Sequence, residues 1–439
     1  MKKIFFALLL IVSSTINAQE KKEVPLFGIK FTGFVKTDVF YDTRQTVSIR
    51  EGHFLFYPDN ISLDVNKNDI NATSNFNMLS IQSRLKGTIT GPSAFGAKTS
   101  GVLEADFFGN ENTNFSDANG FRLRHAFVKL NWKSTELLAG QYWHPMFIAE
   151  SFPGVISFNS GAPFQPFSRN PQLRLTQKMN TLSLIATIFS QRDFQSNGPD
   201  GGSTKYLRNA GVPNVNFQLQ FKPDSTEHLF GIGIDYKILV PRLFSEVTVT
   251  PASAKVDTVT WVVKQIPAVT ARYKVNENIS SVSAFIFAKL IFKPITIKLE
   301  GVLARNAHDL SMIGGYAVRA ISDVTTGNVT YSNLTTGSVW TDIQTNGKKI
   351  QYGLFAGYTK NMGSNDSVKG AIYARGSNID YVYRIAPRIV FISGKFNIAL
   401  ENEYTYAMYG KANGNKKGGV TNGKGIANTR VLLAFIYNF

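Results

Sequence analysis

The chain has 439 residues, no cysteine and a formal net charge of +17, from 47 basic and 30 acidic side chains. Without cysteine, no disulfide and no cysteine-linked lipid anchor can form. The basic residues are scattered singly and form no polybasic block, so the charge favours anionic solutes or lipid as partners over nucleic acid.

The first residues have the three parts of a secretion signal. Lys2 and Lys3 precede an apolar run over 4–12, and small and polar residues continue to Ala18. This pattern predicts a signal peptide over 1–18, whose removal takes two positive charges and further argues against a nucleic-acid partner. After Ala18 no stretch reaches the roughly 18 to 20 apolar residues of a membrane-spanning helix. A membrane protein of this sequence must therefore be a closed β-barrel.

Segments of about ten residues with alternating apolar and polar character recur along the chain and predict barrel strands. They fall at 25–41, 78–90, 97–108, 120–132, 135–142, 170–178, 181–191, 213–222, 227–237, 280–291, 294–306, 349–360, 367–375, 382–393, 395–406 and 427–438. Short connections rich in turn residues alternate with long polar ones, which is typical of barrels with short periplasmic turns and long extracellular loops. The sequence predicts an all-β fold: one transmembrane antiparallel β-barrel of about sixteen strands over 19–439, located in the bacterial outer membrane.

The assignment also places a short turn, a long loop and a hairpin in the second half of the chain. The residues 361–366 are predicted as a periplasmic turn, and 307–348 as one long loop. The segments 246–250 and 256–264 predict a hairpin above the rim, with two further spanning strands, about eighteen in all, as the alternative.

The faces of the predicted strands indicate a water-filled lumen. In 78–90, Leu79, Ile81 and Leu85 are expected to face lipid, while Arg84 and Lys86 face the opposite side. Charged side chains on one tall face imply water on that side, and about sixteen strands enclose a channel wide enough to hold it.

The last strand carries an outward aromatic stripe. In 431–439, every second residue is apolar or aromatic, and Phe435, Tyr437 and Phe439 share that face. This arrangement predicts a final lipid-facing strand with its last residue in the interfacial girdle. It also resembles the C-terminal signature recognised by the bacterial barrel-assembly machinery, which would then be a partner.

The third long loop, 143–169, is rich in aromatic residues, Pro and Gly, and Glu150 is its only acid. An apolar loop needs shelter from water, so we expect it to fold into the barrel and narrow the pore. The alternative is packing on a neighbouring subunit. Aromatic residues in and beside the loop, Tyr142, Trp143, Phe147, Phe152 and Phe158, would alternatively form a stacking path for sugars.

Basic residues alternate with apolar ones on the strands flanking this loop. Arg84 and Lys86 share one face, Arg122 and Arg124 share another, and Arg174 lies between two leucines. Fixed positive charge on a pore wall lowers the entry barrier for anions. We therefore expect these residues to face a narrowed lumen and to give the pore anion selectivity.

Catalytic features are weak. The five histidines lack metal-ligand spacing, and no nucleophile motif or phosphate loop is present, so no cofactor or metal is expected. Glu401 and Glu403 share a strand face, and the favoured interpretation is charge balance with Arg430 and with Lys30 or Lys36 across the closing seam. The pattern favours a channel over an enzyme.

Several short motifs resemble the DcaP-like porin family of bacterial outer membranes. They are GFVKTDVFYDTRQ near the first strand, QSRL in the second, AGQYWHPMF after the fifth, and SRNPQLRLTQ before the sixth. The resemblance implies a sixteen-stranded, usually trimeric barrel that carries anionic solutes such as dicarboxylates. It also implies a constriction with basic residues, here Arg84, Arg122, Arg124, Arg169 and Arg174. Only 19–24 precedes the first predicted strand, so a trimer would rest on barrel contacts.

The sequence thus predicts an outer-membrane porin for small hydrophilic, preferentially anionic solutes. A sugar or neutral-solute channel is the alternative within transport. An outer-membrane hydrolase or a loop-borne adhesin is the alternative from another class.

Overall fold

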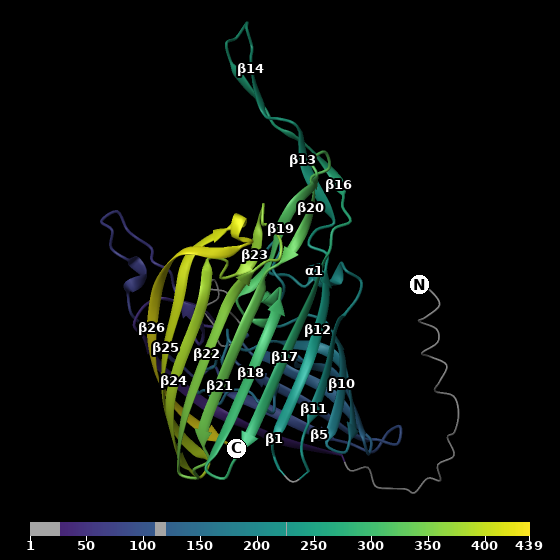
Figure 1. The fold of residues 1–439 in the computed structure, drawn as a ribbon, viewed down its shortest axis with the longest axis vertical. Coiled ribbons are helices and arrows are strands. Elements are labelled where there is room, and N and C mark those ends of the chain that lie inside the picture. Colours follow the sequence, from purple (N-terminus) through teal and green to yellow (C-terminus); the bar gives the residue numbers. More distant parts are fainter. Residues whose placement is uncertain (1–26, 110–119, 225) are drawn as a thin grey trace.

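The protein is a closed antiparallel β-barrel (Figure 1). The computed structural model describes residues 27–109, 120–224 and 226–439, so the predicted signal peptide lies outside the described residues. Seventeen strands form the main sheet, and β4 and β5 share one position because both pair with β1. Pairing of β1 with β26 closes the sheet, which gives the sixteen positions predicted from the sequence.

The barrel strands are β1 (Gly28–Asp42), β4 (Asn75–Leu79), β5 (Arg84–Thr90), β6 (Lys98–Asp106), β7 (Arg122–Asn131), β8 (Thr135–Trp143), β9 (Arg169–Met179), β10 (Leu182–Phe189), β11 (Asn214–Phe221), β12 (Leu229–Leu239), β17 (Ile279–Ile291), β18 (Ile295–Arg305), β21 (Thr335–Thr345), β22 (Ile350–Gly363), β24 (Ile379–Ser393), β25 (Phe396–Asn413) and β26 (Gly419–Asn438). The connecting loops contain β2 (Thr46–Ile49), β3 (Phe54–Pro58), β13 (Phe244–Thr250), β14 (Ser253–Val256), β15 (Val263–Ile266), β16 (Val269–Lys274), β19 (Gly314–Asp323), β20 (Asn328–Asn333) and β23 (Ile372–Arg375), and the short helices η1 (Ile70–Ala72), α1 (Lys205–Arg208), η2 (Ala307–Leu310) and η3 (Gly414–Lys416).

The two ends of the barrel differ. Short turns join the strands at the lower end in Figure 1, and long loops rise from the upper end. We call these the short-turn end and the long-loop end. No helix among the described residues is long and apolar enough to span a membrane.

One predicted barrel strand is wrong. The segment 367–375 contributes only β23, which pairs with β19 in a small three-stranded sheet at the long-loop end. The twelfth barrel position belongs to β21, which lies inside the predicted loop 307–348 and pairs with β18 and β22. Consequently the short turn lies at 346–349, and 361–366, predicted as a periplasmic turn, lies at the opposite end.

The prediction that Leu79 and Ile81 face lipid is wrong. Leu79 lies opposite Asp38, whereas Arg84 lies opposite Phe34, so one extra residue separates β4 from β5 along β1. An extra residue moves the following side chains to the other face of the sheet. Leu79 and Ile81 therefore pack inside the barrel, while Leu85 faces outward as predicted.

The predicted hairpin at 246–264 is present and excludes the eighteen-strand alternative. The strand β13 pairs with β16, and β14 pairs with β15 at the tip, so these strands form their own ladders apart from the barrel sheet. The hairpin projects far above the long-loop end (Figure 1).

Candidate functional site

The loop 144–168 crosses the lumen to strands on the opposite wall. The backbone N–H groups of Ile156 and Ser157 donate to the Glu401 carboxylate on β25 at 2.8 and 2.9 Å. The Ser338 hydroxyl on β21 donates to the Phe164 carbonyl at 2.6 Å. The loop starts from β8, so these contacts place it inside the barrel and not on an outer surface.

Buried polar residues on β24 and β25 hold two loops against the wall. The Arg384 guanidinium donates to the carbonyls of Ala162 in the third loop and of Phe56 in the first loop, at 2.9 and 3.0 Å. The Glu403 carboxylate accepts from the Asn159 amide at 2.7 Å. The wall arginine therefore satisfies carbonyl groups that the loops bring into the interior without strand partners.

The charge balance proposed for the two glutamates is wrong. The Arg430 guanidinium binds Asp42 at 2.7 Å, and the Lys36 ammonium lies 3.1 Å from Asp38. The ion pairs of these cations are therefore with aspartates of β1, and the cations also donate to the carbonyls of Ile156 and Gly52 in the loops. Glu401 and Glu403 instead receive hydrogen bonds from the third loop, and Arg384 lies 3.7 Å from Glu403.

Aromatic rings from the first, third and fourth loops form one interior cluster. Phe54, Phe158, Phe167 and Phe194 pack with ring centroids 5.0 to 6.5 Å apart. Apolar side chains that would be exposed in a free loop are sheltered here, which stabilises the inward position of the loops.

Two of the five aromatic residues predicted for a sugar path are buried. Trp143 stacks on Phe147 at 3.9 Å, and Phe147 and Phe158 are only 4% and 2% exposed. Phe152 is 41% exposed and stacks on Phe147, and Tyr142 and Trp143 are half-buried. A buried ring cannot stack on a passing sugar without displacing the loop.

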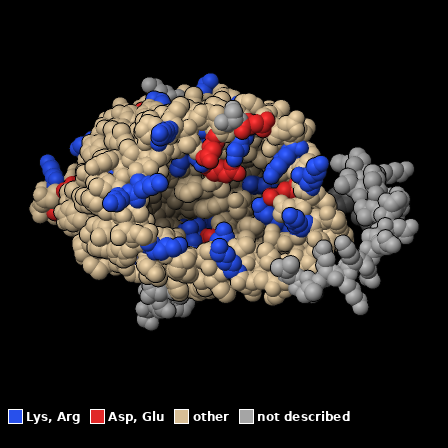
Figure 2. Space-filling view, turned by 90° about the horizontal axis from the view of Figure 1, so that it is seen from below, with Lys and Arg blue, Asp and Glu red and all other residues tan. Residues whose placement is uncertain are grey.

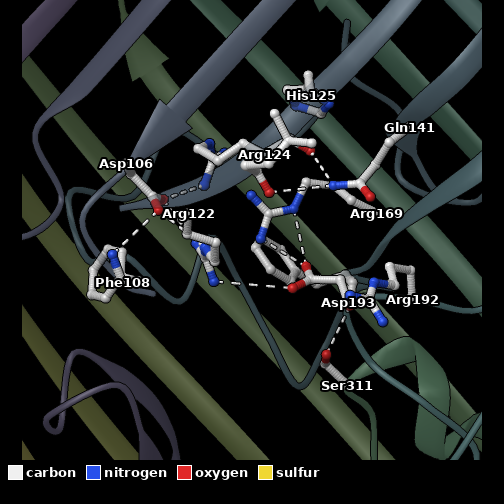
Figure 3. Close-up of polar contacts among 12 residues, drawn as sticks. Asp106, Phe108, Arg122, Arg124, His125, Gln141, Arg169, Arg192, Asp193 and Ser311 are labelled. Carbon is white, nitrogen blue, oxygen red and sulfur yellow. Dashed lines mark hydrogen bonds and ion pairs between the residues drawn. The ribbon is translucent and has the colours of Figure 1, made fainter. Parts of the chain in front are cut away.

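A cluster of arginines and acids lines the wall of β6, β7 and β9 (Figure 3). Arg122 donates to both oxygens of the Asp106 carboxylate at 3.0 and 2.8 Å. Arg124 donates to Glu104 at 2.8 Å and to Asp106 at 2.9 Å. Bidentate pairs of this kind are among the strongest charged hydrogen bonds in proteins. Both predicted arginines thus face the lumen, and each is paired.

Two residues from the loops complete the cluster. The Asp193 carboxylate, in the loop after β10, accepts from Arg169 at 2.7 Å and from Arg50 of the first loop at 3.1 Å. Burial raises the pKa of Asp193, but Arg169, Arg50 and Arg122 outweigh that effect and hold the pKa well below its usual range. Asp193 is therefore an anion that joins two loops to the wall.

Arg84 is the most accessible arginine of the cluster. Its guanidinium lies 3.6 Å from Glu104 and over the Phe34 ring, and its side chain is 22% exposed. With Arg50, Arg122, Arg124 and Arg169, it faces the three carboxylates of Glu104, Asp106 and Asp193. Five cations against three anions leave a local positive surplus.

The remaining predicted residues lie elsewhere. Arg174 donates to Gln172 and to the Trp143 carbonyl, and its guanidinium lies over the Tyr142 ring. Arg174 and Glu150 both line a cavity of about 500 Å³ beneath the third loop, open toward the short turns. Lys86 faces the lumen on β5, opposite Glu104 on β6, and has no ion pair among the described residues.

Other lysines join Lys86 on the lumen face near the short-turn end. The inward positions of β1, β9, β17 and β18 carry Lys30, Lys178, Lys289 and Lys298, all at least partly exposed. Figure 2 shows this end of the barrel as a hollow mouth with more basic than acidic side chains around it. We call Lys30, Lys86, Lys178, Lys289 and Lys298 the lumen lysines.

The outward stripe of the last strand is exposed as predicted. Phe435, Tyr437 and Phe439 face away from the barrel, while Leu432 and Ala434 are buried. The backbone of Phe439 exchanges hydrogen bonds with Gly33 of β1, at 3.1 and 3.2 Å. No group of three or more His, Asp or Glu residues in the described ranges could hold a metal ion.

No protein-family model matches the chain, and no curated protein matches its sequence. Solved structures do match the fold. The anion-selective porin from Comamonas acidovorans is 12% identical, with 94% of this chain and 100% of that chain covered and a TM-score of 0.51. OmpT expressed in the outer membrane of Vibrio cholerae is 9% identical, with 94% and 98% covered and a TM-score of 0.51. A trimer form of OmpT is 10% identical, with 94% and 99% covered and a TM-score of 0.50.

The closed sixteen-position barrel and these neighbours define the class of the protein. It is a bacterial outer-membrane β-barrel with the fold of the porins.

Proposed function

We propose that the protein is a porin that admits small hydrophilic solutes by passive diffusion and prefers anions. The observation that carries this proposal is the set of lumen lysines, which have no carboxylate partner among the described residues and lie at least partly open to water. By contrast, Lys129 on the lumen face pairs with Glu136, and the buried Lys36 and Lys237 pair with aspartates. Unpaired positive charge in a confined channel raises the local concentration of anions.

The third loop, 143–169, would form the constriction of this pore. It crosses the lumen and is held by Glu401, Ser338 and Arg384 on the far wall. Its aromatic rings pack against buried residues of β24, β25 and β26. We therefore infer that solutes pass along the wall of β5, β6 and β7, where Arg84 is partly exposed. In this arrangement, Arg122, Arg124 and Arg169 shape the passage and contribute a smaller net charge because each is paired.

The finer assignments from the sequence stay proposals. Membership of the DcaP-like porins would fit the inward loops and basic wall, with carboxylates as cargo. A homotrimer would match the trimer form of the structural neighbour OmpT. Phe435, Tyr437 and Phe439 would serve recognition by the barrel-assembly machinery, because they form an exposed stripe on the last strand.

The proposal is tested by recording from the purified protein in a planar bilayer under a KCl gradient. We expect discrete conductance steps and a reversal potential displaced toward the equilibrium potential of chloride. The displacement should be larger at low salt, because screening is weaker there. A reversal potential displaced toward the equilibrium potential of potassium would reject anion preference. The absence of any conductance from folded protein would reject the porin function.

A further inference from the structure

Lysines recur at every short turn of the barrel. All seven turns contain an exposed lysine or have one within two residues: Lys98, Lys133, Lys178, Lys222, Lys293, Lys348, Lys349 and Lys395. Among the described turn residues, only Asp224 and Glu227 are acidic. None of these lysines forms an ion pair within the described part of the chain, so their ammonium groups are available to a partner.

Three of these lysines directly adjoin an outward-facing aromatic residue. The pairs are Trp132 with Lys133, Phe292 with Lys293, and Phe396 with Lys395. The three rings are 36 to 44% exposed. Lys222 also follows an outward ring, Phe221, but it lines the lumen cavity with Arg174 and Glu150. Aromatic rings at the ends of barrel strands mark the boundary between hydrocarbon and headgroups.

A lysine beside a girdle ring lies at the height of the lipid phosphates. Its long side chain can extend from the end of the strand into the headgroup layer, while the ring stays at the edge of the hydrocarbon. Figure 2, which views the short-turn end, shows more basic than acidic side chains at this end of the barrel. Ammonium groups at this height match the phosphates of anionic phospholipids.

We propose that Lys133, Lys293 and Lys395 form a ring that binds anionic phospholipid headgroups in the leaflet at the short-turn end. The partner is a glycerophospholipid with net negative charge. Lipid is favoured over a cell-wall polymer because each lysine is fixed beside a membrane-interface ring, whereas a polymer beyond the membrane would need no such pairing. The lumen lysines face the channel and are not part of this ring.

The test compares lipid retention by native mass spectrometry. Wild-type protein is equilibrated in detergent with equal amounts of phosphatidylglycerol and phosphatidylethanolamine. A basic residue near an anionic surface is worth roughly a fivefold change in binding. We therefore expect clear preference for phosphatidylglycerol, and at least about a tenfold fall in that preference when all three lysines become Gln. The preference of the wild type should also weaken at high salt.

Two matched variants control this comparison. Changing the three lysines to Arg keeps the charge and should keep the preference. Changing three exposed lysines of the long-loop end, Lys255, Lys369 and Lys424, to Gln removes the same charge and should leave the preference intact. Equal retention of both lipids by the wild type, or an equal loss in the long-loop variant, would overturn the proposal. So would binding to purified peptidoglycan without any lipid preference.

Discussion

Neutralising two lumen lysines should reduce anion selectivity without unfolding the barrel. In the variant Lys30→Gln/Lys86→Gln, both changes fall on the inward faces of the adjacent strands β1 and β5. Lys86 lies opposite Glu104, but that carboxylate is already bound by Arg124 at 2.8 Å. Removal of either ammonium group therefore leaves no buried acid without a partner.

The size of the effect follows from the exposure of these side chains. A contact between unit charges is worth about 1 kcal/mol in bulk water and about 4 kcal/mol near a protein surface of low dielectric constant. A passing anion stays hydrated and does not contact the ammonium group. We therefore take its attraction to each lysine as about 0.7 kcal/mol. Losing both then costs about 1.4 kcal/mol, which corresponds to about a tenfold fall in the chloride-to-potassium permeability ratio.

The assay is the reversal potential of single channels in a KCl gradient at low salt. The control Lys255→Gln/Lys424→Gln removes the same charge from the long-loop end, and its reversal potential should match the wild type. If the lumen variant conducts normally with an unchanged reversal potential, the lumen lysines do not set selectivity. An equal shift in both variants would point to overall charge instead of the lumen.

Two further substitutions probe the paired groups. Arg122→Gln/Arg124→Gln leaves the fully buried Asp106 without its two cations, so we expect about 3 to 5 kcal/mol of destabilisation. This loss should appear as an earlier heat-induced shift in electrophoresis and be largely reversed by adding Asp106→Asn; unchanged heat stability would mean that the pairs are dispensable. Glu401→Gln removes the charged acceptor of two loop N–H groups, worth about 1 to 3 kcal/mol. Larger, noisier conductance and faster proteolysis of 144–168 should follow, and wild-type behaviour would show that other contacts hold the loop.

Regular alternation of apolar and polar residues made most of the barrel strands predictable. This alternation is weak in β21, which explains why that strand was missed. In β21, Trp340 points inward and is buried, while Gly337 and Thr341 occupy outward positions. An inward aromatic opposite small or polar outward residues blurs the period of two on which the prediction depends. The Asn346-Gly347 pair after this strand is the turn signal that would have located it.

The candidate site was predictable where it lies on strands. Arg122 and Arg124 share an inward face because residues two apart in a strand do so, and the same rule applied to Glu104 and Asp106 would have found their partners. Asp193 was not predictable in this way. It reaches the cluster through the path of an irregular loop, and no periodicity in the sequence encodes that path.

Pairing divides the basic residues of the lumen into two groups with different physical roles. An arginine bonded to a buried carboxylate, such as Arg124 with Asp106, contributes little net field, and its removal mainly leaves an uncompensated charge. An unpaired, hydrated lysine such as Lys30 contributes almost nothing to folding but presents its whole charge to the channel. Stability and selectivity of this barrel should therefore respond to different substitutions, even though both depend on basic side chains facing the same lumen.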